Sequence, residues 1–194
     1  MNLKNEDNIF KLGAILLVVT LIAGLILGIV FNVTKEPIAK QEKINNDKAM
    51  KELFKEADTF DKSNVALKED GKITEVNEAK KGSEVVGYAI KAETKGYAGT
   101  ITLMAGVSVE GKITGIQIIS QSETAGLGQN CTKDFFKDNF KDKDIKKPLN
   151  VVKSNPSPEN EVLAISGATI TSKAVTNAVN DIVTFYKENL EGGK

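Results

Sequence analysis

The clearest pattern in the chain is an unbroken run of uncharged, mostly apolar residues from Leu12 to Val33. At about 1.5 Å per residue, a helix over this run would reach about 33 Å, enough for a hydrocarbon core of about 30 Å. A secretory signal peptide is the competing interpretation, but its apolar region is about 7–15 residues long and ends at a small-residue cleavage site. This run is longer and has no such site after it. We therefore expect a retained transmembrane helix over 12–33, after a short tail over 1–11.

The charges beside this run do not fix its orientation. Cytoplasmic flanks of membrane helices usually carry more Lys and Arg than the opposite flanks. Lysines lie on both sides of this run, so this rule does not identify its cytoplasmic end. Long domains are translocated largely regardless of charge, so a short tail inside and a large domain outside is the arrangement we expect.

A charged segment with scattered apolar residues follows, from Pro37 to about Ala57. Proline favours the first turn of a helix, and the apolar residues here have a loose helical spacing. The pattern predicts a stalk helix within 34–60 that supports the following domain and starts near Pro37.

Three later segments are typical of strands. Val85–Ala92, Thr100–Val109 and Lys112–Ser120 are rich in Ile, Val and Thr, and Glu110-Gly111 separates the last two as a tight turn would. They predict an antiparallel meander with one buried face.

The C-terminal part mixes short elements with one long helix. Val175, Ala178, Val179, Ile182, Val183 and Tyr186 form a single apolar helical stripe. Before this stripe we expect a short helix with buried phenylalanines over Lys133–Phe140, and short strands over Asn150–Lys153 and Val162–Ile165. The pattern predicts an α+β fold: a single transmembrane helix, then one domain with an antiparallel sheet flanked by helices.

The turn before the last helix is the strongest candidate for a binding site. Residues Ser166–Ser172 read Ser-Gly-Ala-Thr-Ile-Thr-Ser. The small residues let the backbone approach a ligand, and the unpaired amides at a helix start favour an anion such as a phosphate. An ordinary loop that ends in an N-cap is the alternative interpretation.

Composition excludes several kinds of site. The 194 residues carry no net charge, no histidine, no tryptophan and one cysteine, Cys131. A basic surface for nucleic acid is therefore not expected. With one cysteine and no histidine, the chain alone lacks the ligands for an iron–sulfur cluster, a c-type haem or a zinc site. It also lacks the base of a histidine-dependent catalytic site. A redox function would need an organic cofactor, or one shared with a partner.

Three segments together identify a family. Lys95–Ile101, Ser122–Gly128 and Ile165–Ser172 resemble, in the same order, the FMN-binding domain of the RnfG subunit of the Rnf complex. The related NqrC subunit of the sodium-pumping NADH:quinone reductase has the same pattern. The resemblance covers the chain from the N-terminal anchor to the last helix, which makes 61–194 the FMN-binding domain.

The resemblance implies one covalent FMN per chain, esterified through its phosphate to Thr169. Thr171 and Ser172 would cap the helix or contact that phosphate, the loop from Glu123 to Gly128 would lie against the flavin, and Lys153 would add positive charge. The cofactor-binding residues implied are Ser166, Gly167, Ala168, Thr169, Ile170, Thr171, Glu123, Thr124, Gly126, Leu127, Gly128 and Lys153. No metal ligand and no catalytic residue is expected.

Without the resemblance these residues have ordinary interpretations, and two positions depart from the family. Lys153 would be a solvated lysine, Glu123 an exposed loop acid, and Gly126 and Gly128 turn residues. Ala125 replaces the family's proline, which should loosen the loop slightly. Leu163 stands where the flavin-attaching enzyme commonly reads an aspartate, three residues before the serine.

The resemblance implies an electron-relay subunit of a membrane-bound, ion-translocating ferredoxin:NAD⁺ oxidoreductase, a redox subunit that is not catalytic alone. Its partners would be other complex subunits, the flavin-attaching transferase and membrane lipid, with no nucleic acid. The implied location is the plasma membrane, with the FMN domain on the extracytoplasmic side. Two alternatives stay open: a membrane-anchored flavin donor to an extracellular reductase, and a flavin-free anchored scaffold.

Overall fold

A computed structural model describes residues 3–67 and 71–192 of the chain. The chain divides into two compact units, Met1–Ile44 and Asn45–Lys194. The first contains most of a long helix, α1 (Leu3–Leu53), and the second contains the end of that helix and all the strands.

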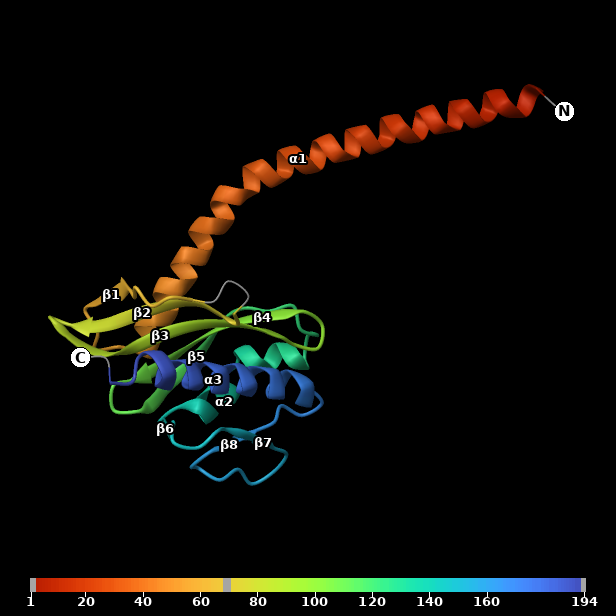
Figure 1. Cartoon of the computed structure of the whole chain (residues 1–194). Coiled ribbons are helices and arrows are strands. Elements are labelled where there is room, and N and C mark those ends of the chain that lie inside the picture. Colours follow the sequence, from red (N-terminus) through yellow and green to blue (C-terminus); the bar gives the residue numbers. More distant parts are fainter. Residues whose placement is uncertain (1–2, 68–70, 193–194) are drawn as a thin grey trace. The chain divides into compact units, whose positions relative to one another are not determined.

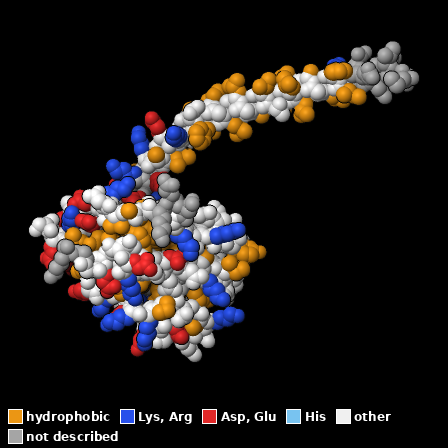
Figure 2. Space-filling view, in the orientation of Figure 1, with side chains coloured by type: hydrophobic (Ala, Val, Ile, Leu, Met, Phe, Trp, Pro, Cys, Tyr) orange, Lys and Arg blue, Asp and Glu red, His pale blue; other side chains and the backbone are white. Residues whose placement is uncertain are grey.

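The apolar run lies within α1 as predicted. Its large hydrophobic side chains from Leu12 to Val33 are all more than half exposed, and Figure 2 shows them along the helix surface. The helix is long and apolar enough to cross a membrane, and the rest of the chain buries none of its most apolar stretch. A bilayer would provide that burial. The predicted transmembrane helix is therefore confirmed.

The expectation that Pro37 starts a stalk helix is wrong, because Pro37 lies inside α1. Proline removes one backbone hydrogen bond without ending the helix here, and the flanking residues continue it on both sides. The helix ends at Leu53, and Thr59 already belongs to a strand. The helical part of 34–60 is thus the last section of α1, and the last turns of that section belong to the second unit. The division of the chain into four parts stays a prediction.

The second unit is built on a six-stranded antiparallel sheet in which neighbours in sequence are neighbours in space (Figure 1). The predicted meander forms its centre, and the hairpin turn of Glu110 and Gly111 is confirmed, with Gly111 at a φ of 75°. The predicted α+β fold is therefore confirmed. The strands are β1 (Thr59–Lys62), β2 (Ile73–Lys81), β3 (Glu84–Lys95), β4 (Thr100–Ser108), β5 (Lys112–Ser120) and β6 (Lys143–Asp144).

Both faces of this sheet are covered, so the prediction that the meander has one buried face is wrong, because the hydrophobic cores on the two faces both bury residues of β3 and β4. The larger hydrophobic core lies between the sheet and α3 (Thr169–Asn189), and Ile182 and Val179 of the predicted stripe are fully buried in it. A smaller core on the other face is formed by the end of α1, where Leu53 and Phe54 pack on Ala89 and Met104. The sheet is thus fixed between two helices, which gives the start of α3 a rigid support.

Short elements connect β5 to α3. Phe136 and Phe140 are fully buried, as predicted, with their rings edge to face at 5.4 Å. The elements are η1 (Gly128–Thr132), α2 (Asp134–Lys137), η2 (Asp138–Phe140), β7 (Asn150–Val152) and β8 (Glu161–Leu163). β7 and β8 pair in parallel as a separate two-stranded sheet.

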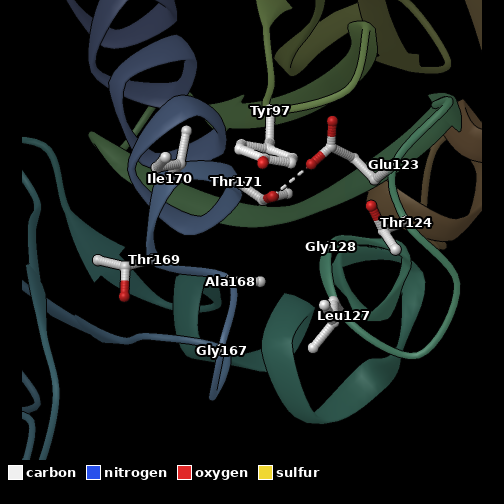
Figure 3. Close-up of a pocket in the computed structure, with 10 residues that line it drawn as sticks. All are labelled: Tyr97, Glu123, Thr124, Leu127, Gly128, Gly167, Ala168, Thr169, Ile170 and Thr171. Carbon is white, nitrogen blue, oxygen red and sulfur yellow. Dashed lines mark hydrogen bonds between the residues drawn. The ribbon is translucent and has the colours of Figure 1, made fainter.

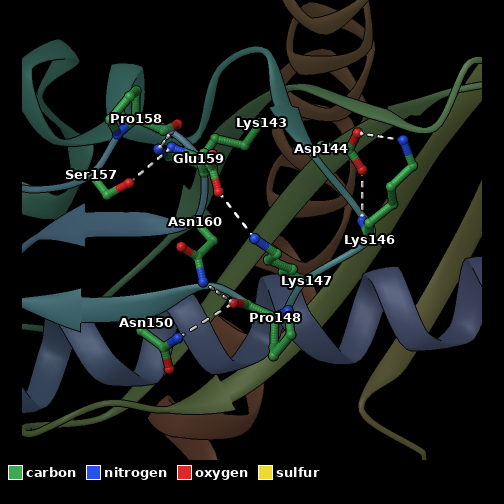
Figure 4. Close-up of polar contacts among 10 residues, drawn as sticks. All are labelled: Lys143, Asp144, Lys146, Lys147, Pro148, Asn150, Ser157, Pro158, Glu159 and Asn160. Atoms are coloured by element: carbon green, nitrogen blue, oxygen red, sulfur yellow. Dashed lines mark hydrogen bonds and ion pairs between the residues drawn. The ribbon is translucent and has the colours of Figure 1, made fainter.

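Polar contacts hold the segment around β7 and β8 (Figure 4). The buried Lys143 ammonium donates to the Pro158 carbonyl at 2.9 Å, and burial lowers the pKa of Lys143 from its ordinary value. Asn160 donates to the Pro148 carbonyl at 3.2 Å. Asn180 of α3 exchanges two hydrogen bonds with the Leu149 backbone, at 2.8 and 2.9 Å. These contacts tie the chain that enters the Ser166–Ser172 turn to the helix that leaves it.

Candidate functional site

A cavity of about 420 Å³ lies at the start of α3 (Figure 3). Its size is within the range of small-molecule sites, roughly 300–1,000 Å³. Three segments far apart in sequence form it, and they are the three that carry the family resemblance. Its lining residues are Tyr97, Glu123, Thr124, Leu127, Gly128, Gly167, Ala168, Thr169, Ile170 and Thr171.

The first wall of the cavity is the start of α3, Gly167–Thr171. The N-cap residue is Ala168, and no side chain in the described part of the chain caps the helix. The first amides of α3 therefore lack the partner that an ordinary N-cap would give them, which favours an anion over the plain capping interpretation. Gly167 has a φ of 74°, and a Cβ there would lie 3.0 Å from a Leu127 methyl group. Glycine thus permits both the turn and the close contact.

The hydroxyl groups of Ser166–Ser172 differ in availability. The Thr171 hydroxyl donates to the Glu123 carboxylate. The Ser172 hydroxyl accepts from the Ile165 amide at 2.9 Å and donates to the Ala168 carbonyl at 3.0 Å, so it locks the turn. Among the described residues, Thr169 makes no side-chain hydrogen bond, and it is one of the residues that line the cavity (Figure 3). Within the described part of this stretch, Thr169 is thus the cavity-lining residue whose hydroxyl has no hydrogen-bond partner.

Glu123 lies in the second wall, the loop Glu123–Gly128 between β5 and η1. It is buried, with 7% of its surface exposed, so it is not the exposed loop acid of the ordinary interpretation. One carboxylate oxygen accepts from the Ala98 amide at 2.9 Å, and the other accepts from Thr171. Burial raises the pKa of Glu123, but the hydrogen bonds from Thr171 and from backbone amides near Ala98 outweigh it, so its pKa lies below the ordinary value.

Two glycines leave room for this carboxylate. A Cβ on Gly96 would lie 2.5 Å from one Glu123 oxygen, and a Cβ on Gly128 would lie 2.5 Å from the other and 2.6 Å from the Thr171 hydroxyl. Any larger residue at either position would displace the carboxylate. Gly128 is therefore more than a turn residue, because glycine there is needed for close approach.

The lowered pKa predicts how stability depends on pH. A carboxylate whose pKa is lowered by folding contributes stability above its unfolded pKa of about 4.3, and this contribution is lost as the pH falls through the lower folded pKa. The Glu123→Gln variant should therefore melt below the wild type at neutral pH, and the difference should shrink in acid. Thermal unfolding of both chains in detergent, from neutral pH to about pH 3, measures this. A difference that stayed constant over that range would contradict the assignment.

Apolar side chains surround the cavity although they are open to solvent. Tyr97, Ile170 and Leu127 are 70, 57 and 44% exposed. They come from three different segments and surround the same space (Figure 3). Exposed apolar patches of this kind mark binding sites, because a ligand removes the apolar surface from water when it binds. A planar aromatic ligand would suit these three side chains.

Tyr97 was not among the residues predicted to bind a cofactor. It sits in a tight turn, Gly96–Gly99, closed by a 2.8 Å hydrogen bond from the Gly96 amide to the Gly99 carbonyl. The signal in the sequence was a lone aromatic residue between two glycines, in a segment that carries the resemblance. We call Gly96–Gly99 the Tyr97 turn.

Most of the predicted site residues come together, and three do not line the cavity. Thr169, Gly167, Ala168, Ile170, Thr171, Glu123, Thr124, Leu127 and Gly128 line it. Ser166 is exposed beside it, and Gly126 is exposed at a φ of 76° in the second wall. Lys153 is exposed after β7, and its contact with a phosphate stays a prediction.

Cys131 in η1 is no nucleophile. It is fully buried, and burial, followed by the Glu123 charge, raises its pKa to about 11. A thiol with such a pKa stays protonated at neutral pH and is inert. The cavity is thus lined by two threonines that make no side-chain hydrogen bond among the described residues, Thr124 and Thr169, by the uncapped start of α3 and by apolar side chains, which suits binding a phosphate-bearing aromatic molecule.

Comparison with known proteins agrees with this chemistry. The model of the FMN-binding domain matches residues 96–184, and the model of the RnfG N-terminal region matches residues 1–53. The subunit designated C in the Na(+)-translocating NADH-quinone reductase of Parabacteroides distasonis has the same fold. Its crystal structure superposes with a TM-score of 0.56 at 23% identity, over 76% of this chain and 94% of that one.

Two curated relatives match nearly the whole chain. The subunit designated G in the proton-translocating ferredoxin:NAD(+) oxidoreductase complex of Clostridium ljungdahlii is 40% identical, over 93% of this chain and 92% of that one. The subunit with the same designation in the Na(+)-translocating complex of Acetobacterium woodii is 37% identical, over 92% of each. The chain therefore belongs to the RnfG family of subunits of ion-translocating oxidoreductase complexes and contains the FMN-binding domain of that family.

Proposed function

We propose that the chain is an electron-relay subunit of a membrane-bound, ion-translocating ferredoxin:NAD⁺ oxidoreductase, and that it carries one FMN joined through its phosphate to Thr169. The observation that carries this proposal is that Thr169 lines the cavity at the uncapped start of α3 and, among the described residues, makes no side-chain hydrogen bond. The match to the FMN-binding domain and the full-length relatives support it. They also speak against a flavin-free scaffold.

The residues around Thr169 fit a phosphate. The first amides of α3 have no side-chain cap and can donate to an anion near the helix start, and the helix dipole stabilises such a charge by about 0.3–1 kcal/mol. Gly167 keeps the backbone close, and Ser172 holds the turn in place. A covalent link also keeps the cofactor present whatever its concentration outside the protein.

The other lining residues fit the ring system of a flavin. Tyr97, Leu127 and Ile170 offer exposed apolar surface around the cavity, which would pack on a planar aromatic group. FMN, when bound, accepts and donates electrons. The protein would orient it and leave one part open to partner subunits, since Tyr97, Ile170 and Leu127 at the cavity are exposed.

The chain is proposed to carry electrons and not to bind either substrate. The sequence lacks a glycine-rich nicotinamide fingerprint that opens a helix after a strand. The run Leu12–Val33 lacks ionisable groups, which ion translocation through a membrane normally needs. Both substrate sites and the ion path would therefore belong to partner subunits, and attachment of the flavin would require a separate transferase.

The domain is proposed to lie on the extracytoplasmic side of the plasma membrane, anchored in lipid by the apolar part of α1. Protease added to intact cells or right-side-out vesicles should then remove the domain and leave the anchor. A domain that is protected until the membrane is opened would contradict this orientation.

Electron relay is tested in the assembled complex. Reduced ferredoxin, added without NAD⁺, should bleach the visible absorbance of the flavin on this subunit, and NAD⁺ added later should restore it. A flavin on this chain that stays oxidised while the complex transfers electrons would contradict the relay.

A further inference from the structure

The Glu123 carboxylate joins parts of the cavity that are distant in sequence. One oxygen accepts from the Ala98 amide of the Tyr97 turn at 2.9 Å, and the other accepts from Thr171 in the first turn of α3. Figure 3 shows the Thr171 contact with Glu123 in the cavity that Tyr97 also lines. A single side chain therefore links the turn that carries Tyr97 to the helix start that carries Thr169.

This carboxylate has little freedom to bind a ligand itself. It is 7% exposed, both oxygens have protein partners, and the sites of missing Cβ atoms on Gly96 and Gly128 lie 2.5 Å from it. A hydrogen bond between a carboxylate and a hydroxyl or amide is stronger than one between neutral groups. The contacts and the two glycines describe a fixed link, which differs from the direct flavin contact expected for Glu123.

We propose that Glu123 and Thr171 form a positioning pair that fixes the Tyr97 turn relative to Thr169 across the cavity. For its effect on the cofactor, this inference rests on the proposed flavin site. Without the pair, the Tyr97 turn is no longer linked to α3 through the Glu123 carboxylate. The start of α3 stays in place, because Ser172 binds the Ile165 amide and the Ala168 carbonyl independently. Attachment at Thr169 should therefore persist, while the flavin becomes more open to solvent.

Isosteric variants of α3 separate positioning from general stability. Thr171→Val removes the hydroxyl that binds Glu123 and keeps the shape of the side chain. Thr171→Ser keeps the hydroxyl. Thr176→Val is the matched control, because Thr176 is also buried in α3 but donates to the Ser172 carbonyl at 2.9 Å, within the helix.

The first readout needs no flavin. Hydrogen exchange of the Ala98 amide, followed by NMR in the full chain in detergent, should be about tenfold faster in Thr171→Val and in Glu123→Gln. Because the two residues act as one unit, the double variant should exchange no faster than Glu123→Gln alone. Thr171→Ser and Thr176→Val should match the wild type.

The second readout uses the flavin-carrying chain. Iodide should quench flavin fluorescence more strongly in Thr171→Val than in the wild type, and Thr171→Ser should restore protection. Unchanged Ala98 exchange in both Thr171→Val and Glu123→Gln, or an equal effect of Thr176→Val, would overturn the positioning pair. A wild-type chain that takes up no flavin would overturn the proposed function instead, and the exchange measurement would still decide the pair.

Discussion

Replacing Thr169 with alanine is expected to abolish covalent flavin and leave the fold intact. Thr169 lines the cavity, and among the described residues its hydroxyl makes no side-chain hydrogen bond. Loss of a threonine without such bonds, at a position that is not buried, should change the free energy of unfolding by no more than about 0.5 kcal/mol. Flavin fluorescence of the protein band in a denaturing gel, after expression with the attaching transferase, measures the link.

Thr124→Ala is the matched control, because Thr124 places another hydroxyl in the same cavity from the second wall. It should keep its fluorescent band. Fluorescence that survives in Thr169→Ala would move the attachment to another residue, and a loss in both variants would indicate damage to the cavity.

Replacing Gly128 with valine should have the second largest effect. The first added atom alone would lie 2.5 Å from a Glu123 oxygen and 2.6 Å from the Thr171 hydroxyl. Overpacking of this kind costs about 1–3 kcal/mol, and here it also displaces the Glu123–Thr171 contact. We expect a lower melting temperature and a smaller flavin-carrying fraction, with any flavin still on Thr169. Near-ultraviolet circular dichroism of the tyrosines and in-gel fluorescence measure the two effects.

Gly126→Asn serves as its control in the same loop. Gly126 has a φ of 76°, which asparagine tolerates better than most residues, and nothing lies within 4 Å of its added Cβ. The two variants should therefore differ clearly. Equal melting temperatures and equal flavin content in Gly128→Val and the wild type would refute the close packing around Glu123.

The parts of the fold that the sequence predicted have strong local patterns. The apolar run over 12–33 is long and uncharged, β4 and β5 are rich in Ile, Val and Thr on either side of a tight turn, and α3 has one apolar helical stripe. β2 was missed because its alternation is broken by register shifts near Thr74 and between Ala79 and Lys80, and because it buries Asn77, which donates to Glu75 at 2.9 Å. β1 and β6 are too short for any period to show.

The sequence predicted most residues of the candidate site but not the hydrogen bonds that join them. The motifs pointed to Thr169 and to the loop of Glu123, and the structure brings them to one cavity. Sequence could not show that Glu123 is buried between Ala98 and Thr171, since both contacts join segments distant in the chain. Tyr97 was overlooked for the same reason, because its place at the cavity depends on how the Tyr97 turn meets α3.

The proposed function requires a phosphoester on the Thr169 hydroxyl, and tandem mass spectrometry of native material tests this link directly. Trypsin cleaves after Lys153 and Lys173, so a single peptide between them contains Thr169. In chains purified from native membranes, this peptide should carry the mass of one FMN less one water, and fragmentation should place it on Thr169. An unmodified peptide, or a flavin on any other residue, would contradict the account.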